Sequence, residues 1–309
     1  MADVVEREAQ ILAAREVGNL NNKQKQRLVE NGIISSLVLM LHSQDYESIE
    51  AALFALLNLA FGSERNKLRI AKAGAIPAIL KILQWRNESL MELSLAALLI
   101  LSSCSANKPE IASSGAIQLL LELISESISH QAKFDAVSTL HNLSTFPQII
   151  PSIVLCGGLV TLIQLIYESE KSSNLVEKAM ALLESIVSSS DFALNEACEV
   201  GGVIRLLVEA VDEGTAACQE HAAGILLLMC ESCRERYGGM ILVDGTWRAR
   251  EKAKALLLLL RDCNNGGSSS RVKHSKNVAF EEVMREIDRE EWGGSSVQLV
   301  EEMIAKLRT

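Results

Sequence analysis

The chain has 309 residues with a formal net charge of −9, and 49% of its residues are apolar while only 4% are aromatic. An acidic chain is a poor candidate for holding nucleic acid, because phosphate backbones require clustered lysine and arginine. A high apolar fraction with few aromatics favours many thin aliphatic layers over one globular core. The chain also has only four prolines, and its apolar residues recur at three-and-four spacing, so we expect an all-α protein.

The N-terminus lacks the basic start and the apolar core of a signal peptide. Apolar runs stay below the ~18 residues that a membrane helix requires. We therefore expect a soluble monomer of the cytosol or the nucleus, without a membrane span. Cys230 and Cys233 form a lone Cys-x-x-Cys pair with no histidine at zinc-finger spacing, which predicts no metal site. The sequence carries no nucleophile signature or phosphate loop, so we predict no enzyme activity and no cofactor.

A glycine followed by small or branched apolar residues recurs along the chain, and it predicts a repeat. The intervals between these glycines are 42, 41, 42 and 44 residues. Each glycine is expected to end one short helix in the left-handed conformation, which costs glycine least. The five glycines are Gly32, Gly74, Gly115, Gly157 and Gly201.

Each glycine precedes a short apolar helix, a polar turn and then a longer helix. Three helices in about 42 residues resemble the armadillo repeat, whose expected period is ~40–47 residues. Such a unit cannot bury its own apolar face, so neighbouring units must stack. We predict a right-handed α-solenoid over 4–263, with five recognisable repeats and partial units at either end. The short helices are expected over 76–83, 117–124 and 159–166, and the long ones over 49–60, 91–103, 132–144, 175–187 and 217–230, after a partial first repeat over 12–20.

Two segments resemble the armadillo half of plant U-box ubiquitin ligases and their armadillo-only relatives. They are 64–77 (ERNKLRIAKAGAIP) and 245–262 (GTWRAREKAKALLLLLRD). The resemblance covers roughly 4–263 and implies that this part chooses substrates or partner kinases, while in that family a separate U-box recruits the ubiquitin-conjugating enzyme. The repeat pattern already runs by residue 9, and 264–309 are too short and too polar for a U-box. We therefore expect no ligase activity from this chain alone.

The resemblance also implies that the long helix of each repeat lines a groove. An asparagine there can hold an extended peptide, because one carboxamide both donates to and accepts from a peptide backbone. In this register Asn19, Asn58 and Asn142 are present, whereas Ile100, Glu184 and Leu228 interrupt the series. The interruption disfavours a nuclear-import receptor. The alternative is that the asparagines cap or bridge neighbouring helices.

Other predicted groove positions are acidic or sit four residues before the asparagine register. Carboxylates there would favour a neutral or basic extended peptide as partner. The alternative is an ordinary solvated helix face. The further groove candidates are Phe54 and Ser138 in the earlier register, and the acidic residues Glu47, Asp135, Glu177, Glu184 and Glu231.

The C-terminal region departs from the repeat. Gly245 follows the matching Gly214 by 31 residues, which predicts that the sixth repeat lacks one short helix. Residues 264–277 read as a flexible linker, and 278–309 contain two short amphipathic segments. These segments could cover the open end of the solenoid, bind a partner helix or occupy the groove.

Taken together, these patterns predict a non-enzymatic adaptor that binds other proteins along an armadillo groove. The alternatives are a substrate-recognition component of U-box-type ubiquitination machinery without its own U-box, a nuclear-import carrier, or an enzyme of unknown type.

Overall fold

The computed structural model describes residues 2–237, and within that range the chain forms sixteen α-helices and three 3₁₀ helices with no strand. The shortened sixth repeat, the linker 264–277 and the tail 278–309 lie outside the described residues. Contacts divide the chain into unit 1, residues 1–156, and unit 2, which begins at residue 157. Each unit is described by itself.

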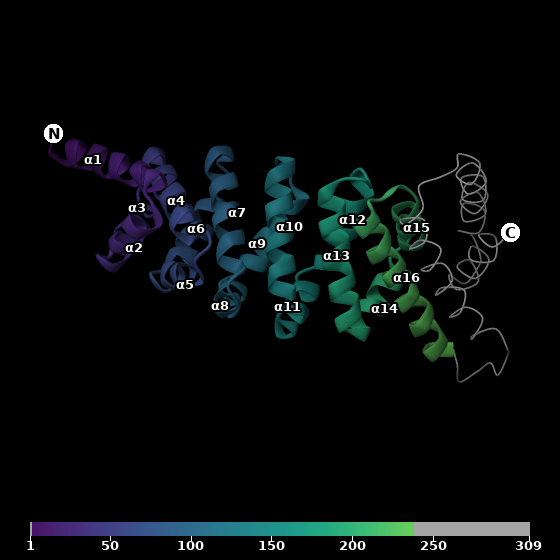
Figure 1. Ribbon diagram of the computed structural model, residues 1–309. Helices are drawn as coiled ribbons and strands as arrows, with labels where there is room; N and C mark the ends of the chain where they lie inside the picture. Colours follow the sequence, from purple (N-terminus) through teal and green to yellow (C-terminus); the bar gives the residue numbers. More distant parts are fainter. Residues whose placement is uncertain (1, 238–309) are drawn as a thin grey trace, which may run out of the picture. The chain divides into compact units, whose positions relative to one another are not determined.

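Unit 1 contains α1 to α11. The order short, short, long recurs from α2 onward, and the long helices α1, α4, α7 and α10 pack side by side in chain order (Figure 1). The helices are α1 Ala2–Glu16, η1 Val17–Asn19, α2 Asn22–Glu30, α3 Ile33–Met40, α4 Tyr46–Ala60, α5 Glu64–Lys72, α6 Ala75–Gln84, α7 Glu88–Ser102, η2 Ser105–Asn107, α8 Lys108–Ser113, α9 Ala116–Ser125, α10 His130–Ser144, η3 Pro147–Ile149 and α11 Ile150–Leu155.

Unit 2 continues the same order with one short helix and one long helix, followed by two short helices and one long helix. Its long helices α13 and α16 pack on each other. The helices are α12 Gly158–Glu168, α13 Asn174–Ser189, α14 Asp191–Glu199, α15 Val203–Glu213 and α16 Ala216–Tyr237.

The core of each unit is a set of aliphatic layers between successive helices. In unit 1, Ile49, Leu53 and Leu95 are fully buried between long helices and their short neighbours. Each such side chain contributes about 1.5–3 kcal/mol when it is removed from water. This layered burial confirms the prediction of thin aliphatic layers rather than one globular core.

The predicted repeat boundaries are confirmed at four of the five glycines. Gly32, Gly74, Gly115 and Gly157 have φ between +82° and +90°, and each starts the second short helix of its repeat. The fifth prediction was wrong by one residue, because Gly202, at φ +77°, takes the left-handed conformation in place of Gly201.

The long helices begin one to three residues earlier than predicted, because a polar residue caps each N-terminus. In α4, for example, Asp45 accepts a hydrogen bond from the Ser48 backbone N–H at 3.1 Å, so the helix starts at Tyr46 and not at residue 49. The partial first repeat was also misplaced, since its helix α1 ends at Glu16 and Asn19 lies in the 3₁₀ turn η1. The other capped long helices are α7 (Asn87), α10 (Ser129) and α13 (Ser173).

Candidate partner-binding face

One side of α4, α7 and α10 in unit 1 carries five of the ten predicted groove residues. We call this side the long-helix face. Ser129 at the start of α10 donates to Glu92 near the start of α7 at 2.6 Å, and Asn142 near the end of α10 donates to Ser102 at the end of α7 at 3.0 Å. Helices α7 and α10 therefore run parallel, with their starts and their ends aligned. The long-helix face comprises Glu50, Phe54 and Asn58 of α4, Glu92, Ala96 and Ile100 of α7, and Asp135, Ser138 and Asn142 of α10.

On α4 the face presents an aromatic ring beside a carboxamide. Phe54 remains 47% exposed, and Asn58 Nδ2 donates to the Phe54 backbone carbonyl at 2.9 Å. Gly18 in η1 lies directly against both side chains, since a Cβ there would be 3.1 Å from the Phe54 ring and 3.6 Å from Asn58 Nδ2. Asn58 Oδ1 accepts no hydrogen bond from the residues that the structure describes. This oxygen is thus available to a backbone N–H of another polypeptide.

On α7 the same face is apolar. Ala96, Leu99 and Ile100 are partly exposed, and the first and last of these occupy the positions 42 residues after Phe54 and Asn58. Ile100 was identified in the sequence only as an interruption of the asparagine series. The sequence analysis missed the apolar character of this middle part of the face.

On α10 the face is polar, and its groups are mostly engaged within the unit. Asn142 Nδ2 donates to Ser102 Oγ and, at 3.5 Å, to the Leu99 carbonyl of α7, so this asparagine bridges two long helices. Asp135 and Ser138 are each only 6% exposed, and Ser138 Oγ has no hydrogen-bond partner among the residues that the structure describes. Bridging was the alternative reading of the asparagines, and for Asn142 it describes the contact observed.

The carboxyl group of Asp135 is perturbed by its surroundings. Burial raises its pKa above the ordinary value, and the negative charge of Glu92 adds to this effect, while the hydrogen bond from Gln131 Nε2 at 2.8 Å opposes it. Ionised Asp135 therefore lowers the stability of the folded state, and a positive charge placed nearby would stabilise the carboxylate.

Three predicted groove residues lie away from the long-helix face or in the other unit. Asn19 is exposed in η1 and its amide donates to Glu16 at 3.2 Å. In unit 2, Glu177 accepts from Thr215 Oγ1 at 2.6 Å, and Glu184 pairs with His221 at 2.7 Å. These two carboxylates therefore link α13 to α16. The side chain of Glu231 lies outside the described residues.

The first turns of the long helices in unit 1 carry exposed carboxylates. Glu47 is 3.9 Å from Arg15, and Glu92 accepts from Ser129. Glu50 and Glu88 are exposed and have no ion pair with any residue of the described part. One edge of the long-helix face is therefore acidic.

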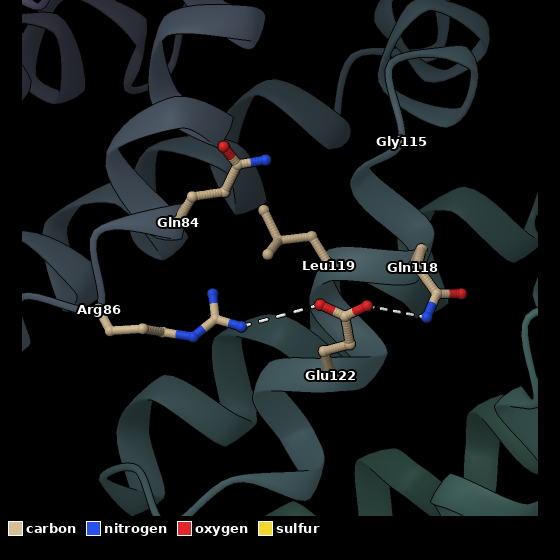
Figure 2. A pocket seen from close by; sticks show the side chains of 6 residues that line it. All are labelled: Gln84, Arg86, Gly115, Gln118, Leu119 and Glu122. Atoms are coloured by element: carbon tan, nitrogen blue, oxygen red, sulfur yellow. Dashed lines mark hydrogen bonds and ion pairs between the residues drawn. The ribbon is translucent and has the colours of Figure 1, made fainter.

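A separate polar cleft of about 380 Å³ lies on the short-helix side of unit 1, between the end of α6 and α9 (Figure 2). Its cation is already neutralised, because the Arg86 guanidinium pairs with Glu126 at 2.8 Å and lies 3.8 Å from Glu122. Gln118 also donates to Glu122 at 2.9 Å. The cleft thus offers no unpaired charge to an anion.

Residues 2–237 contain neither a cluster of metal-ligating side chains nor a single helix that could span a membrane. No group of three or more His, Cys, Asp or Glu side chains in this range could hold a metal ion. No single helix of the range has both the length and the apolar character to cross a bilayer. Two pairs of consecutive helices have that length and apolar character only when the two helices of a pair are taken together, and each pair is sharply bent at its break.

A protein-family comparison matches residues 21–61 and 104–145 to the Armadillo/beta-catenin-like repeat. The two matched stretches each end in a long helix of unit 1 and cover the helix order described above. This chain contains armadillo repeats. The prediction of an all-α armadillo solenoid is confirmed.

Several proteins of known sequence are similar to this armadillo-repeat chain. It is 32% identical over 248 residues to U-box domain-containing protein 45 of Arabidopsis thaliana, which covers 75% of this chain and 32% of that protein. It is 32% identical over 179 residues to U-box domain-containing protein 7 of the same plant, and 26% identical over 188 residues to catenin beta of Urechis caupo. These matches cover 56% and 59% of this chain and 22% of each relative. The chain thus spans a third or less of the length of these relatives. The predicted resemblance to the armadillo part of plant U-box proteins is confirmed.

Solved structures show the same fold. A computationally designed armadillo repeat protein for modular peptide recognition matches 72% of this chain and 98% of its own, with a TM-score of 0.65 and 22% identity. A designed armadillo repeat protein in complex with the peptide (KR)4 matches 71% of this chain and 91% of its own, with a TM-score of 0.62 and 22% identity. At this level of identity the likeness concerns the fold alone.

Proposed function

We propose that this armadillo-repeat protein is a non-enzymatic scaffold of the cytosol or nucleus that binds a partner polypeptide on the long-helix face of unit 1. The observation that carries the proposal is the half-exposed ring of Phe54 beside the Asn58 carboxamide oxygen, which accepts no hydrogen bond from the described residues. Full burial of a phenylalanine is worth about 1.5–3 kcal/mol, so roughly half of that remains to be gained by a partner. A partner backbone N–H would complete the hydrogen bonding of Asn58.

The contrast with unit 2 supports this choice of surface. There the corresponding long-helix positions are occupied by side-chain pairs, such as Glu184 with His221 and Glu177 with Thr215. Groups that already satisfy one another have little to gain from a partner. In unit 1, α4 and α7 instead leave apolar and carboxamide groups open to solvent.

The test is site-specific photo-crosslinking in an Arabidopsis thaliana cell line. Phe54 is replaced by p-benzoylphenylalanine, and crosslinked peptides are sequenced by mass spectrometry. The matched control carries the same group at Leu155, which is 83% exposed at the end of the short helix α11 in the same unit. We expect defined peptides attached at position 54 and absent at position 155, each then confirmed by binding of the synthetic peptide to the purified chain. Equal labelling at both positions, or labelling at 155 alone, would contradict the proposal.

A second candidate is a substrate-recognition role in plant ubiquitination, favoured by the U-box relatives that match up to 80% of the chain. We expect the purified chain, mixed with activating enzyme, conjugating enzyme and ubiquitin, to transfer no ubiquitin by itself. If the role is correct, removing the chain from cells slows the ubiquitin-dependent turnover of the partner captured at position 54. An unchanged half-life of that partner would leave the scaffold proposal in place and remove this one.

A further inference from the structure

We propose that the long-helix face of unit 1 recognises an extended segment in which lysine or arginine alternates with apolar residues. This inference rests on the proposed function and names the chemistry of the partner. It depends on two bands of side chains that cross the helices at different heights.

The first band is acidic and crosses all three helices. It is formed by Glu50 on α4, Glu92 on α7 and Asp135 on α10, at intervals of 42 and 43 residues. Exposed Glu47 and Glu88 extend it on the first two helices. Within the described residues the only cation within 4 Å of this set is Arg15, 3.9 Å from Glu47. The band therefore keeps a surplus of negative charge that complements a basic partner.

The second band is apolar and lies one helical turn, about 5.4 Å, further along α4 and α7. It is formed by Phe54 and Ala96, with Ile100 one turn beyond. The Phe54 ring is the most exposed member at 47%. A purely basic peptide would cover this band with charged groups and would leave its apolar surface unused.

An extended chain satisfies both bands, because its successive side chains point to opposite sides. Eight extended residues span about 26 Å, which exceeds the ~20 Å needed to cross three helices spaced ~10 Å apart. Lysines on one side then meet the carboxylates, and apolar residues on the other side meet Phe54 and Ile100. The Asn58 carboxamide oxygen, one turn beyond Phe54 on α4, can accept a backbone N–H from the same peptide.

The experiment measures fluorescence polarisation of four labelled octapeptides with the full chain. The peptides are (KL)4, which carries both features, (KS)4, which lacks the apolar side, (EL)4, which reverses the charge, and (KR)4, which is basic throughout. We expect (KL)4 to bind at least about tenfold more tightly than each of the other three, a difference of ~1.4 kcal/mol. Equal binding of (EL)4 would overturn the charge assignment, and equal binding of (KS)4 or (KR)4 would overturn the apolar one.

Two variants assign the binding to this face. The double substitution Glu50→Gln with Glu92→Gln should weaken (KL)4 about three- to tenfold and reduce its dependence on salt, whereas Glu110→Gln on the short helix α8 should change neither. Phe54→Ala should weaken (KL)4 but leave the weak binding of (KS)4 unchanged, and Leu155→Ala is its control. Phe54 and Leu155 are both exposed, so neither substitution removes a core side chain. Circular dichroism verifies that all the variants are folded. Unchanged (KL)4 binding in either test variant would overturn the inference.

The two proposals fail differently. If position 54 captures partner peptides in cells while (KL)4 does not bind, the scaffold function stands and only the alternating basic–apolar chemistry is wrong. If neither the cellular peptides nor the synthetic ones bind, the long-helix face is not a binding surface and both proposals fail.

Discussion

Glu184 and His221 are paired across the two long helices of unit 2, with Glu184 Oε2 2.7 Å from His221 Nδ1. The other oxygen of the same carboxylate lies over Gly224, at a position where a Cβ would overlap it. Glycine in the middle of a helix costs about 1 kcal/mol relative to alanine. At this point of α16 the missing side chain makes room for the carboxylate that reaches His221.

Gly224→Ala is therefore expected to push Glu184 away from His221. The gain in helix propensity, about 1 kcal/mol, should roughly offset the loss of a partly exposed pair worth about 0.5–1 kcal/mol, so the single variant should change stability little. The decisive measurement is a double-mutant cycle followed by urea unfolding. His221→Ala should cost about 0.5–1 kcal/mol in the natural background and nearly nothing beside Ala at position 224. An equal cost in both backgrounds would show that Gly224 does not make room for the pair.

Cys218 is expected to be unreactive, in contrast to the partly exposed Cys156. Burial raises the pKa of the Cys218 thiol from 9.0 to about 11, with the charge of Glu177 as a further cause. Since the thiolate is the reactive form, iodoacetamide at pH 8 should label Cys156 well before Cys218, as tryptic peptide masses can show. The raised pKa favours the protonated thiol in the folded state. Its stabilising effect is therefore complete below pH 9 and is lost as pH rises through about 11, and Cys218→Ala should remove that alkaline loss.

The repeat and its register could be predicted from the sequence because they depend on local rules. A left-handed glycine, an apolar period and a polar cap are each readable within a few residues, which is why four of five boundary glycines were correct. The prediction named Gly201 instead of Gly202 because the two glycines are adjacent and either can end a helix. The predicted helices started late because capping residues such as Asp45 were assigned to the preceding turn.

The chemistry of the candidate site was less predictable because it depends on partners far apart in the sequence. Asn58 and Asn142 occupy the same register, yet Asn58 bonds within its own helix and Asn142 bonds to α7, 40 residues away. His221 gave no signal as a partner of Glu184, since 37 residues separate them. The 42-residue step that relates Ile100 to Asn58 could have revealed the apolar band if the step had been applied to apolar residues.

Lys171 is a buried cation that completes the end of α12. Its Nζ donates to the Ile166 carbonyl at 2.8 Å, and more weakly to two neighbouring carbonyls, at a helix end where such groups have no intrahelical partner. Lys171→Met keeps the aliphatic stem but leaves these carbonyls unsatisfied, so we expect a loss of about 1.5–3 kcal/mol in the free energy of unfolding. Lys178→Met on α13 is the matched control and should cost less than about 0.5 kcal/mol. Similar losses in both variants would show that Lys171 has no special capping role.

Asp135→Asn tests whether the buried charge of Asp135 lowers the stability of the fold while it strengthens partner binding. Burial raises the pKa of Asp135 in the folded state, so its stabilising effect exists below the unfolded value of 3.8 and is lost as pH rises through the folded value. At pH 7 the asparagine variant should therefore be more stable than the natural chain, and this difference should shrink as the pH approaches 4. Asparagine Oδ1 can still accept from Gln131, so the local hydrogen bond is kept. The same variant should bind (KL)4 more weakly, and a loss of stability at pH 7 would contradict the assignment.

Gly18→Ala addresses the Phe54 ring without changing any residue of the long-helix face. A methyl group there would lie 3.1 Å from the ring edge and 3.6 Å from Asn58 Nδ2, so the ring must move by a few tenths of an ångström. The backbone at Gly18 is not left-handed, and the substitution is thus free of backbone strain. We expect the free energy of unfolding to change by less than about 1 kcal/mol, because the ring is half exposed and can rotate into solvent.

The Gly18→Ala variant should bind (KL)4 about threefold more weakly, and Gly18→Val, with its larger side chain, should weaken binding further. Gly201→Ala is the control, since a Cβ there meets nothing within 4 Å. If both Gly18 variants bind (KL)4 as tightly as the natural chain, the position of the Phe54 ring does not determine partner recognition.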